Sequence, residues 1–103
     1  MQRFQMVVIV TYHRPENGQA IGKVIATQGC FEEDVLEIGA AEIWARGEIY
    51  LDLAHDEAGF AAVVARAIWA ANGGYCPVEV ISTSLPPAKV FPFGEQQYAE
   101  LTK

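Results

Sequence analysis

Two kinds of periodicity meet in residues 48–74, which read EIYLDLAHDEAGFAAVVARAIWAANGG. Over residues 48–54 apolar and polar side chains alternate, as they do along a strand that buries one face. From Asp56 onward the apolar positions recur every three or four residues until Gly73 and Gly74. This pattern predicts a helix with an N-cap at its start and a glycine end. A strand followed directly by a long helix indicates a mixed α and β domain.

The preceding run, residues 35–45, is also strand-like, and Arg46 and Gly47 separate it from the alternating strand. Glycine supplies the positive φ that a tight hairpin needs, so we expect a β-hairpin that turns at these two residues. Strict alternation in the first strand would place the acidic Glu42 among apolar residues. A β-bulge near Gly39 would resolve this conflict.

Three further elements flank the hairpin and helix. Phe4 to Tyr12 is rich in Val and Ile and predicts a buried strand, residues 15–28 have helical spacing, and Cys76 to Ser84 alternates again. The order strand, helix, strand, strand, helix, strand resembles the split βαβ topology called ferredoxin-like. We therefore expect an α+β fold: a ferredoxin-like βαββαβ sandwich with an antiparallel sheet of order 4-1-3-2 and two helices on one face.

The last part of the chain differs in kind from the rest. We expect an α+β domain over residues 1–85 and an extended arm with a short helix over residues 86–103. Phe91 and Phe93 make the arm too apolar for a free terminus, so it is expected to dock on a sheet edge or on a partner subunit. Its prolines exclude a central strand.

Composition limits the classes of partner. The chain has 103 residues, 51% of them apolar, and a net charge of −6. Nucleic acid is an unexpected partner for so acidic a domain, because phosphate backbones are bound by clustered cations. No apolar run approaches the roughly 20 residues that span a bilayer, so no membrane association is expected. The N-terminus lacks the apolar core of a signal peptide, and we expect a cytoplasmic protein.

The fold leaves one face of the sheet open. If Phe4 and the alternate residues that follow it face the helices, the intervening residues point outward. A half-apolar face in water is most simply covered by a second copy of the chain, so we expect a homodimer. The expected interface residues are Val7, Ile9, Ile43 and Ile81 on the open face and Phe91 and Phe93 in the arm.

A cavity between two such sheets would be lined by polar residues at strand ends. The candidate ligand-binding residues are Thr11, His13, Tyr50, Asp52 and Glu79. A partly buried carboxylate near a histidine could act as a general base. The alternative is that Asp52 and Glu79 are ordinary solvated strand residues, and acidic side chains are seldom buried.

Motifs for nucleotide loops, hydrolases and zinc proteases are absent from the sequence, and no cofactor or metal is predicted. Cys30 and Cys76 belong to no metal-ligand spacing and are expected to be buried thiols. The leading hypothesis is a small acidic binding or protein-interaction module that acts as a homodimer. The alternatives are a cofactor-independent small enzyme of the dimeric α+β barrel type and a small-molecule-sensing domain.

Overall fold

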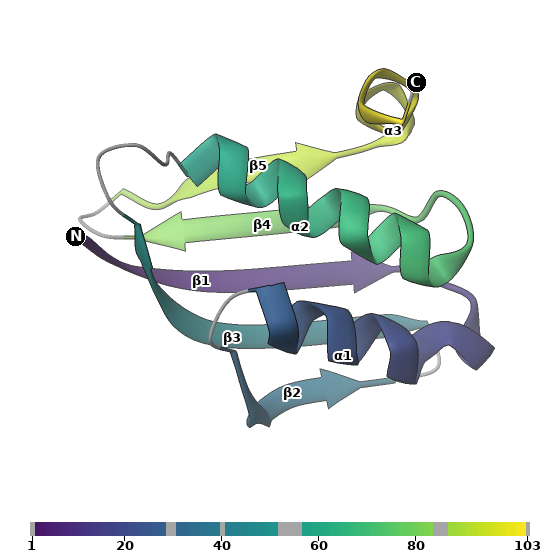
Figure 1. Ribbon diagram of the computed structural model, residues 1–103, viewed down its shortest axis with the longest axis horizontal. Helices are drawn as coiled ribbons and strands as arrows, with labels where there is room; N and C mark the ends of the chain where they lie inside the picture. Colours follow the sequence, from purple (N-terminus) through teal and green to yellow (C-terminus); the bar gives the residue numbers. More distant parts are fainter. Residues whose placement is uncertain (1, 29–30, 40, 52–56, 84–86, 103) are drawn as a thin grey trace.

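A computed structural model of the protein describes residues 2–28, 31–39, 41–51, 57–83 and 87–102. In chain order its elements are β1 (Gln2–Thr11), the 3-10 helix η1 (Pro15–Asn17), α1 (Gly18–Gln28), β2 (Phe31–Ile38), β3 (Glu42–Leu51), α2 (Glu57–Asn72), β4 (Val78–Thr83), β5 (Lys89–Phe93) and α3 (Glu95–Leu101). The α+β class expected from the sequence is confirmed (Figure 1).

The described strands form one antiparallel sheet with the order β2-β3-β1-β4-β5. β1 lies in the middle and pairs with β3 along its whole length. The observed order differs from the expected 4-1-3-2 of four strands, because Lys89–Phe93 adds a fifth strand beside β4. Pro92 fits this position, since an edge strand tolerates a residue that cannot donate to the ladder.

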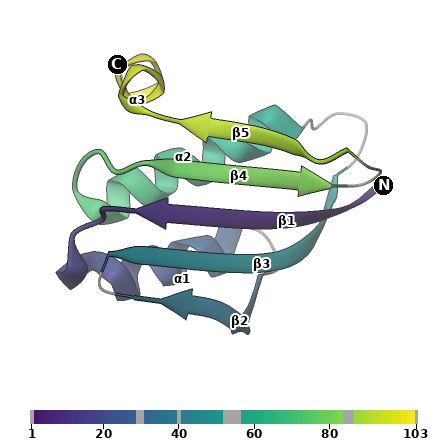
Figure 2. The ribbon, with the colours of Figure 1, turned by 180° about the vertical axis from the view of Figure 1, so that it is seen from behind.

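α1 and α2 lie side by side on one face of the sheet, in front of it in Figure 1 and behind it in Figure 2. The core lies between this face and the two helices. β1 contributes alternate residues to it, as expected from the sequence, and these are Phe4, Met6, Val8 and Val10. The helices contribute Ile21, Ile25, Ala61, Val64, Ala65, Ile68 and Trp69. Burial of these side chains is the main stabilising contribution to the fold.

The hairpin between β2 and β3 turns at a different place from the one the sequence suggests. The turn lies between Ile38 and Glu42, where the Gly39 N–H donates to the Glu42 carbonyl at 2.7 Å. Gly47 lies inside β3, paired with Met6 of β1. The expected turn at Arg46 and Gly47 is therefore wrong, because pairing with the ten residues of β1 holds β3 extended through them. No bulge at Gly39 is needed.

This shift changes the face on which Ile43 lies. Ile43 belongs to β3, where it shares a face with Ala45 and Ile49, and it is 0% exposed. The expectation that Ile43 points outward into an interface is wrong. Side chains alternate along a strand, so moving a turn changes which residues are buried.

The C-terminal elements extend the sheet and the core. Phe93 is buried, and its ring packs edge to face on that of Trp69 of α2, with 6.1 Å between the ring centroids. Phe91 is half-buried against the same core. α3 is held by Tyr98, whose ring centroid lies 5.0 Å from that of Trp69. The two phenylalanines expected at an interface thus pack within their own chain.

Candidate functional site

None of the described helices covers the face of the sheet opposite α1 and α2 (Figure 2). We call it the open face. The pairing register assigns its residues, which alternate with those of the core. From β3, β1, β4 and β5 they are Glu42, Trp44, Arg46, Glu48, Arg3, Gln5, Val7, Ile9, Thr11, Glu79, Ile81, Thr83, Val90 and Pro92. Val7, Ile9 and Ile81 are placed there as the sequence predicted.

Apolar side chains gather at the middle of the open face. In one row across the strands, Val7 lies between Arg46 and Ile81, and Val90 follows at the edge. The next row places Ile9 between Trp44 and Glu79, with Pro92 at the edge. We call the apolar members of these two rows the open-face patch: Val7, Ile9, Trp44, Ile81, Val90 and Pro92. Trp44 is 36% exposed and Val90 51%, so the patch contacts solvent in the single chain.

Charged side chains of both signs surround the patch. Arg3 and Glu48 form an exposed ion pair at 3.9 Å, and the Trp44 indole N–H donates to the Glu42 carboxylate. The side chains of Arg46 and Glu79 make no ion pair or hydrogen bond with any residue that the structure describes. A cation and an anion are therefore both unpaired on the same face.

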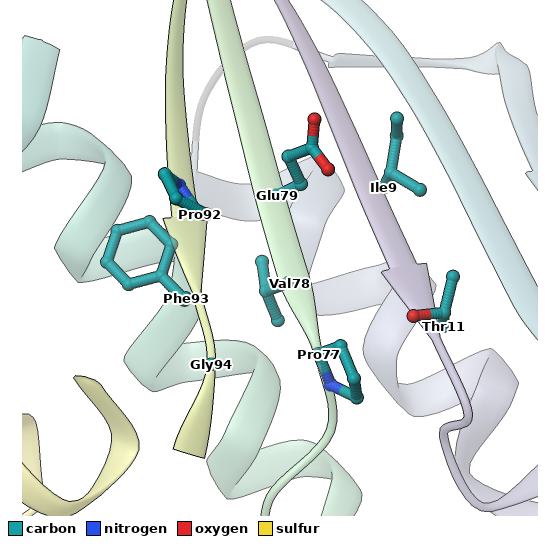
Figure 3. A pocket seen from close by; sticks show the side chains of 8 residues that line it. All are labelled: Ile9, Thr11, Pro77, Val78, Glu79, Pro92, Phe93 and Gly94. Atoms are coloured by element: carbon teal, nitrogen blue, oxygen red, sulfur yellow. The ribbon is translucent and has the colours of Figure 1, made fainter. Parts of the chain in front are cut away.

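A pocket of about 190 Å³ opens where β1, β4 and β5 meet (Figure 3). It is lined by Ile9, Thr11, Pro77, Val78, Glu79, Pro92, Phe93 and Gly94. Its walls are apolar except for the Thr11 hydroxyl and the Glu79 carboxylate, which come from adjacent strands. The half-buried Glu79 lacks a cation there, and removing a carboxylate from water without a partner costs free energy.

The structure brings together two of the five residues expected at a ligand site. Thr11 and Glu79 line the pocket. Tyr50 pairs with Arg3 at the opposite end of β1, eight residues or roughly 27 Å from Thr11, so it does not join them. Asp52 lies outside the described residues. His13 is buried and does not line the pocket.

His13 and its neighbour Tyr12 have unusual environments. His13 is 3% exposed, and neither its Nδ1 nor its Nε2 has a hydrogen-bond partner among the described residues. Tyr12 has a φ of 54° and is 81% exposed, although its backbone N–H donates to the Ala41 carbonyl at 2.8 Å. A left-handed conformation in a non-glycine residue is uncommon and costs free energy. The sequence carried no signal for this conformation.

The loop after β1 is fixed to the end of α2. The Arg14 N–H donates to the Asn72 Oδ1 at 2.8 Å, and the Asn17 side-chain amide donates to the Asn72 carbonyl at 2.7 Å. The helix ends at Asn72 and is followed by Gly73, whose φ is +77°, and the Arg14 guanidinium lies beside Gly73. A cation at this position also suits the negative end of the helix dipole. These hydrogen bonds fix the position of the loop that follows β1.

No group of three or more His, Cys, Asp or Glu side chains that could hold a metal occurs in the part of the chain that the structure describes. The described helices include none that is long and apolar enough to cross a membrane. Comparison with known proteins finds no matching family model, no matching curated protein and no matching solved structure.

Proposed function

We propose that the protein is a small non-catalytic interaction module that forms a homodimer through its open face. The observation that carries this proposal is the open-face patch, whose apolar side chains remain in solvent in the single chain. A contiguous apolar patch within a charged rim is typical of an interaction surface. The run β2-β3-β1-β4, with α1 and α2 on one side, supports a ferredoxin-like arrangement that β5 and α3 extend.

The open face is large enough for a stable interface. Strands lie about 4.8 Å apart and each residue advances about 3.4 Å, and β4 and β5 have only six and five residues, so one face of the sheet covers about 640 Å². The resulting footprint is of the order of the 800 Å² that each partner buries in a standard protein interface. Trp44 supplies the kind of large, amphipathic anchor that dominates binding energy at such interfaces.

The charges on this face favour a second copy over a polyanion. In a two-fold dimer the same surface is used twice, so it must be complementary to itself. The open face carries Arg3 and Arg46 together with Glu42, Glu48 and Glu79. Arg3 is paired with Glu48 in its own chain, so Arg46 is the cation that can meet a carboxylate on a second copy. A nucleic acid would meet three carboxylates on the same surface, in a chain of net charge −6.

The pocket supports a second candidate function, a small-ligand site of the kind used by a sensing domain or a cofactor-independent enzyme. Thr11 and Glu79 would contact the ligand. Its volume of about 190 Å³ is below the roughly 300 to 1,000 Å³ typical of ligand sites. His13, the other expected acid or base, does not line the pocket. The interaction module is therefore the better supported function.

Sedimentation equilibrium of the wild type and two charge-insertion variants tests the homodimer. Ile81→Asp places a carboxylate in the open-face patch, and we expect it to shift the protein to monomer. Val63→Asp makes the same kind of change on α2, where Val63 is 48% exposed on the other side of the sheet, and should leave the dimer intact. A monomeric wild type at about 100 μM, or equal dissociation of the two variants, would contradict the proposal.

A further inference from the structure

Arg46 and Glu79 lie on the two strands that flank β1. Arg46 of β3 pairs in register with Val7, and Glu79 of β4 pairs with Ile9. Strands lie about 4.8 Å apart and each residue advances about 3.4 Å, so the two Cα positions are separated by roughly 12 Å. The two charges share one face and form no ion pair within one chain.

We propose that, in the homodimer, Arg46 of each copy forms an ion pair with Glu79 of the other copy. This inference rests on the proposed function and completes the pocket, because the second copy supplies the cation that the pocket lacks. The guanidinium group of Arg46 from the second copy thus fills the mouth of the pocket. There it pairs with the Glu79 carboxylate and lies next to the Thr11 hydroxyl.

The two-fold symmetry of a dimer is compatible with this pairing. A two-fold axis that lies between the two sheets and passes over β1 between Val7 and Ile9, inclined to the strands, exchanges the positions of Arg46 and Glu79. One such axis forms the ion pair twice, once on each side of the apolar centre. It also stacks the two β1 strands at an angle, as in packed sheets whose strands cross.

Burial makes the pairing necessary for the dimer. A second copy placed on the open-face patch would remove Glu79 from water, since Glu79 lies in the same row as Ile9 and Pro92. A buried carboxylate without a cation costs several kcal/mol, and a charge-assisted bond with a guanidinium offsets that cost. The arrangement also fixes the orientation of the two copies, because only one axis satisfies both pairs.

The other described cations are already engaged or lie elsewhere. Arg3 pairs with Glu48, and Lys89 pairs with Glu57 of α2 at 3.2 Å. Arg14 lies beside the end of α2. The remaining described cations, Lys23 and Arg66, are on the two helices that cover the opposite face. Arg46 is therefore the cation of the described open face that remains available to Glu79.

A charge-swap cycle measured by sedimentation equilibrium tests this pairing. Arg46→Glu and Glu79→Arg each create like charges at two symmetric contacts, and each should raise the dimer Kd by roughly tenfold or more. The double variant Arg46→Glu with Glu79→Arg restores opposite charges, and its Kd should return to within about threefold of the wild type. Circular dichroism and urea midpoints of all variants establish that each folds.

Arg3→Glu is the matched control, because it makes the same charge reversal on the same face at a residue outside the proposed pair. It should leave the Kd within about threefold of the wild type. A dimeric wild type whose single variants dimerise equally well, or whose double variant stays monomeric, would overturn this pairing while leaving the homodimer in place. A monomeric wild type would instead overturn the proposed function and this inference together.

Discussion

Two buried polar side chains near the end of β1 differ in how their polar atoms are satisfied. Asn72 accepts a hydrogen bond from the Arg14 N–H at 2.8 Å and donates to the Gly74 carbonyl at 3.1 Å. His13 has no hydrogen-bond partner among the described residues. A buried polar group stabilises a fold only when it is hydrogen-bonded, so Asn72 stabilises this region and His13 destabilises it.

This difference predicts opposite effects for the same type of substitution. His13→Leu removes an unsatisfied polar group with little change in volume and should raise the free energy of unfolding by about 1 kcal/mol. Asn72→Leu leaves the Arg14 N–H without its acceptor and the Gly74 carbonyl without its donor, and it should lower the free energy of unfolding by about 2 to 3 kcal/mol. Urea unfolding followed by circular dichroism measures both. Destabilisation by His13→Leu as large as that by Asn72→Leu would contradict this account.

The buried thiol of Cys76 predicts a change of stability in alkaline solution. Burial raises the pKa of Cys76 from 9.0 to about 11. The thiol of the unfolded chain therefore loses its proton at lower pH than that of the folded chain. The contribution of the protonated Cys76 thiol to stability is complete below pH 9 and is lost as the pH rises through 11.

The test compares the pH dependence of stability of Cys30→Ser with that of the double variant Cys30→Ser with Cys76→Ala. Cys30→Ser should lose stability more steeply between pH 9 and pH 11 than the double variant, in urea titrations at each pH. Other groups that titrate in this range, including Tyr75, affect both proteins alike. Parallel pH profiles would show that the Cys76 thiol does not contribute.

At the scale of elements, α3 depends on a cluster of aromatic rings. Trp69 of α2 lies 5.0 Å from Tyr98, 6.1 Å from Phe93 and 6.5 Å from Tyr75 between ring centroids. The Trp69 indole N–H also donates to the Cys76 carbonyl at 2.8 Å, which fixes the ring. A helix of seven residues is too short to be stable alone, so these contacts hold it in place.

Tyr98→Ala should therefore release α3 and lower the free energy of unfolding by about 2 to 3 kcal/mol. Limited proteolysis should then cleave within residues 95–101, which the wild type protects. Gln96→Ala is the control, because Gln96 is exposed on the same helix and its substitution should change the stability by less than about 0.5 kcal/mol. Equal effects of the two substitutions would contradict the docking of α3 through Tyr98.

The β2–β3 hairpin shows where an element boundary depends on its partner strand. Gly39 and Gly47 are both glycines beside strand-like residues, and both are compatible with a turn. Pairing with β1 decides between them, because Gly47 lies opposite Met6 in a ladder that continues on both sides. A contact between residues 41 positions apart cannot be inferred from local periodicity, so the sequence predicts the wrong face for Ile43.

For the whole molecule, the proposed dimer couples folding to concentration. Association stabilises the folded state by mass action, so the Tm of the wild type should rise with protein concentration between about 1 and 100 μM. The Tm of Ile81→Asp should not depend on concentration, because its open-face patch carries a charge. Differential scanning calorimetry at several concentrations measures this. A wild-type Tm that is independent of concentration would contradict the homodimer.

The candidate site divides into a part that alternation predicts and a part that it does not. Val7, Ile9, Thr11, Glu79 and Ile81 follow the strict alternation of β1 and β4, and the structure places them on the open face. Alternation predicts the face of the sheet on which a residue lies, but it does not predict the position of that residue relative to residues of other strands. Alternation therefore groups Tyr50 with Thr11, although the register places them at opposite ends of β1.

The amino-acid sequence alone predicts the α+β class, the end of the long helix just before Gly73, and the alternate burial of residues in β1 and β4. Each of these follows from interactions between residues close together in the chain, which periodicity records. Three features are seen only in the folded chain: the turn at Gly39, the fifth strand, and the separation of Arg46 and Glu79 across β1. Those features depend on pairing between distant strands, and the free energy of that pairing is set by the whole sheet and its core.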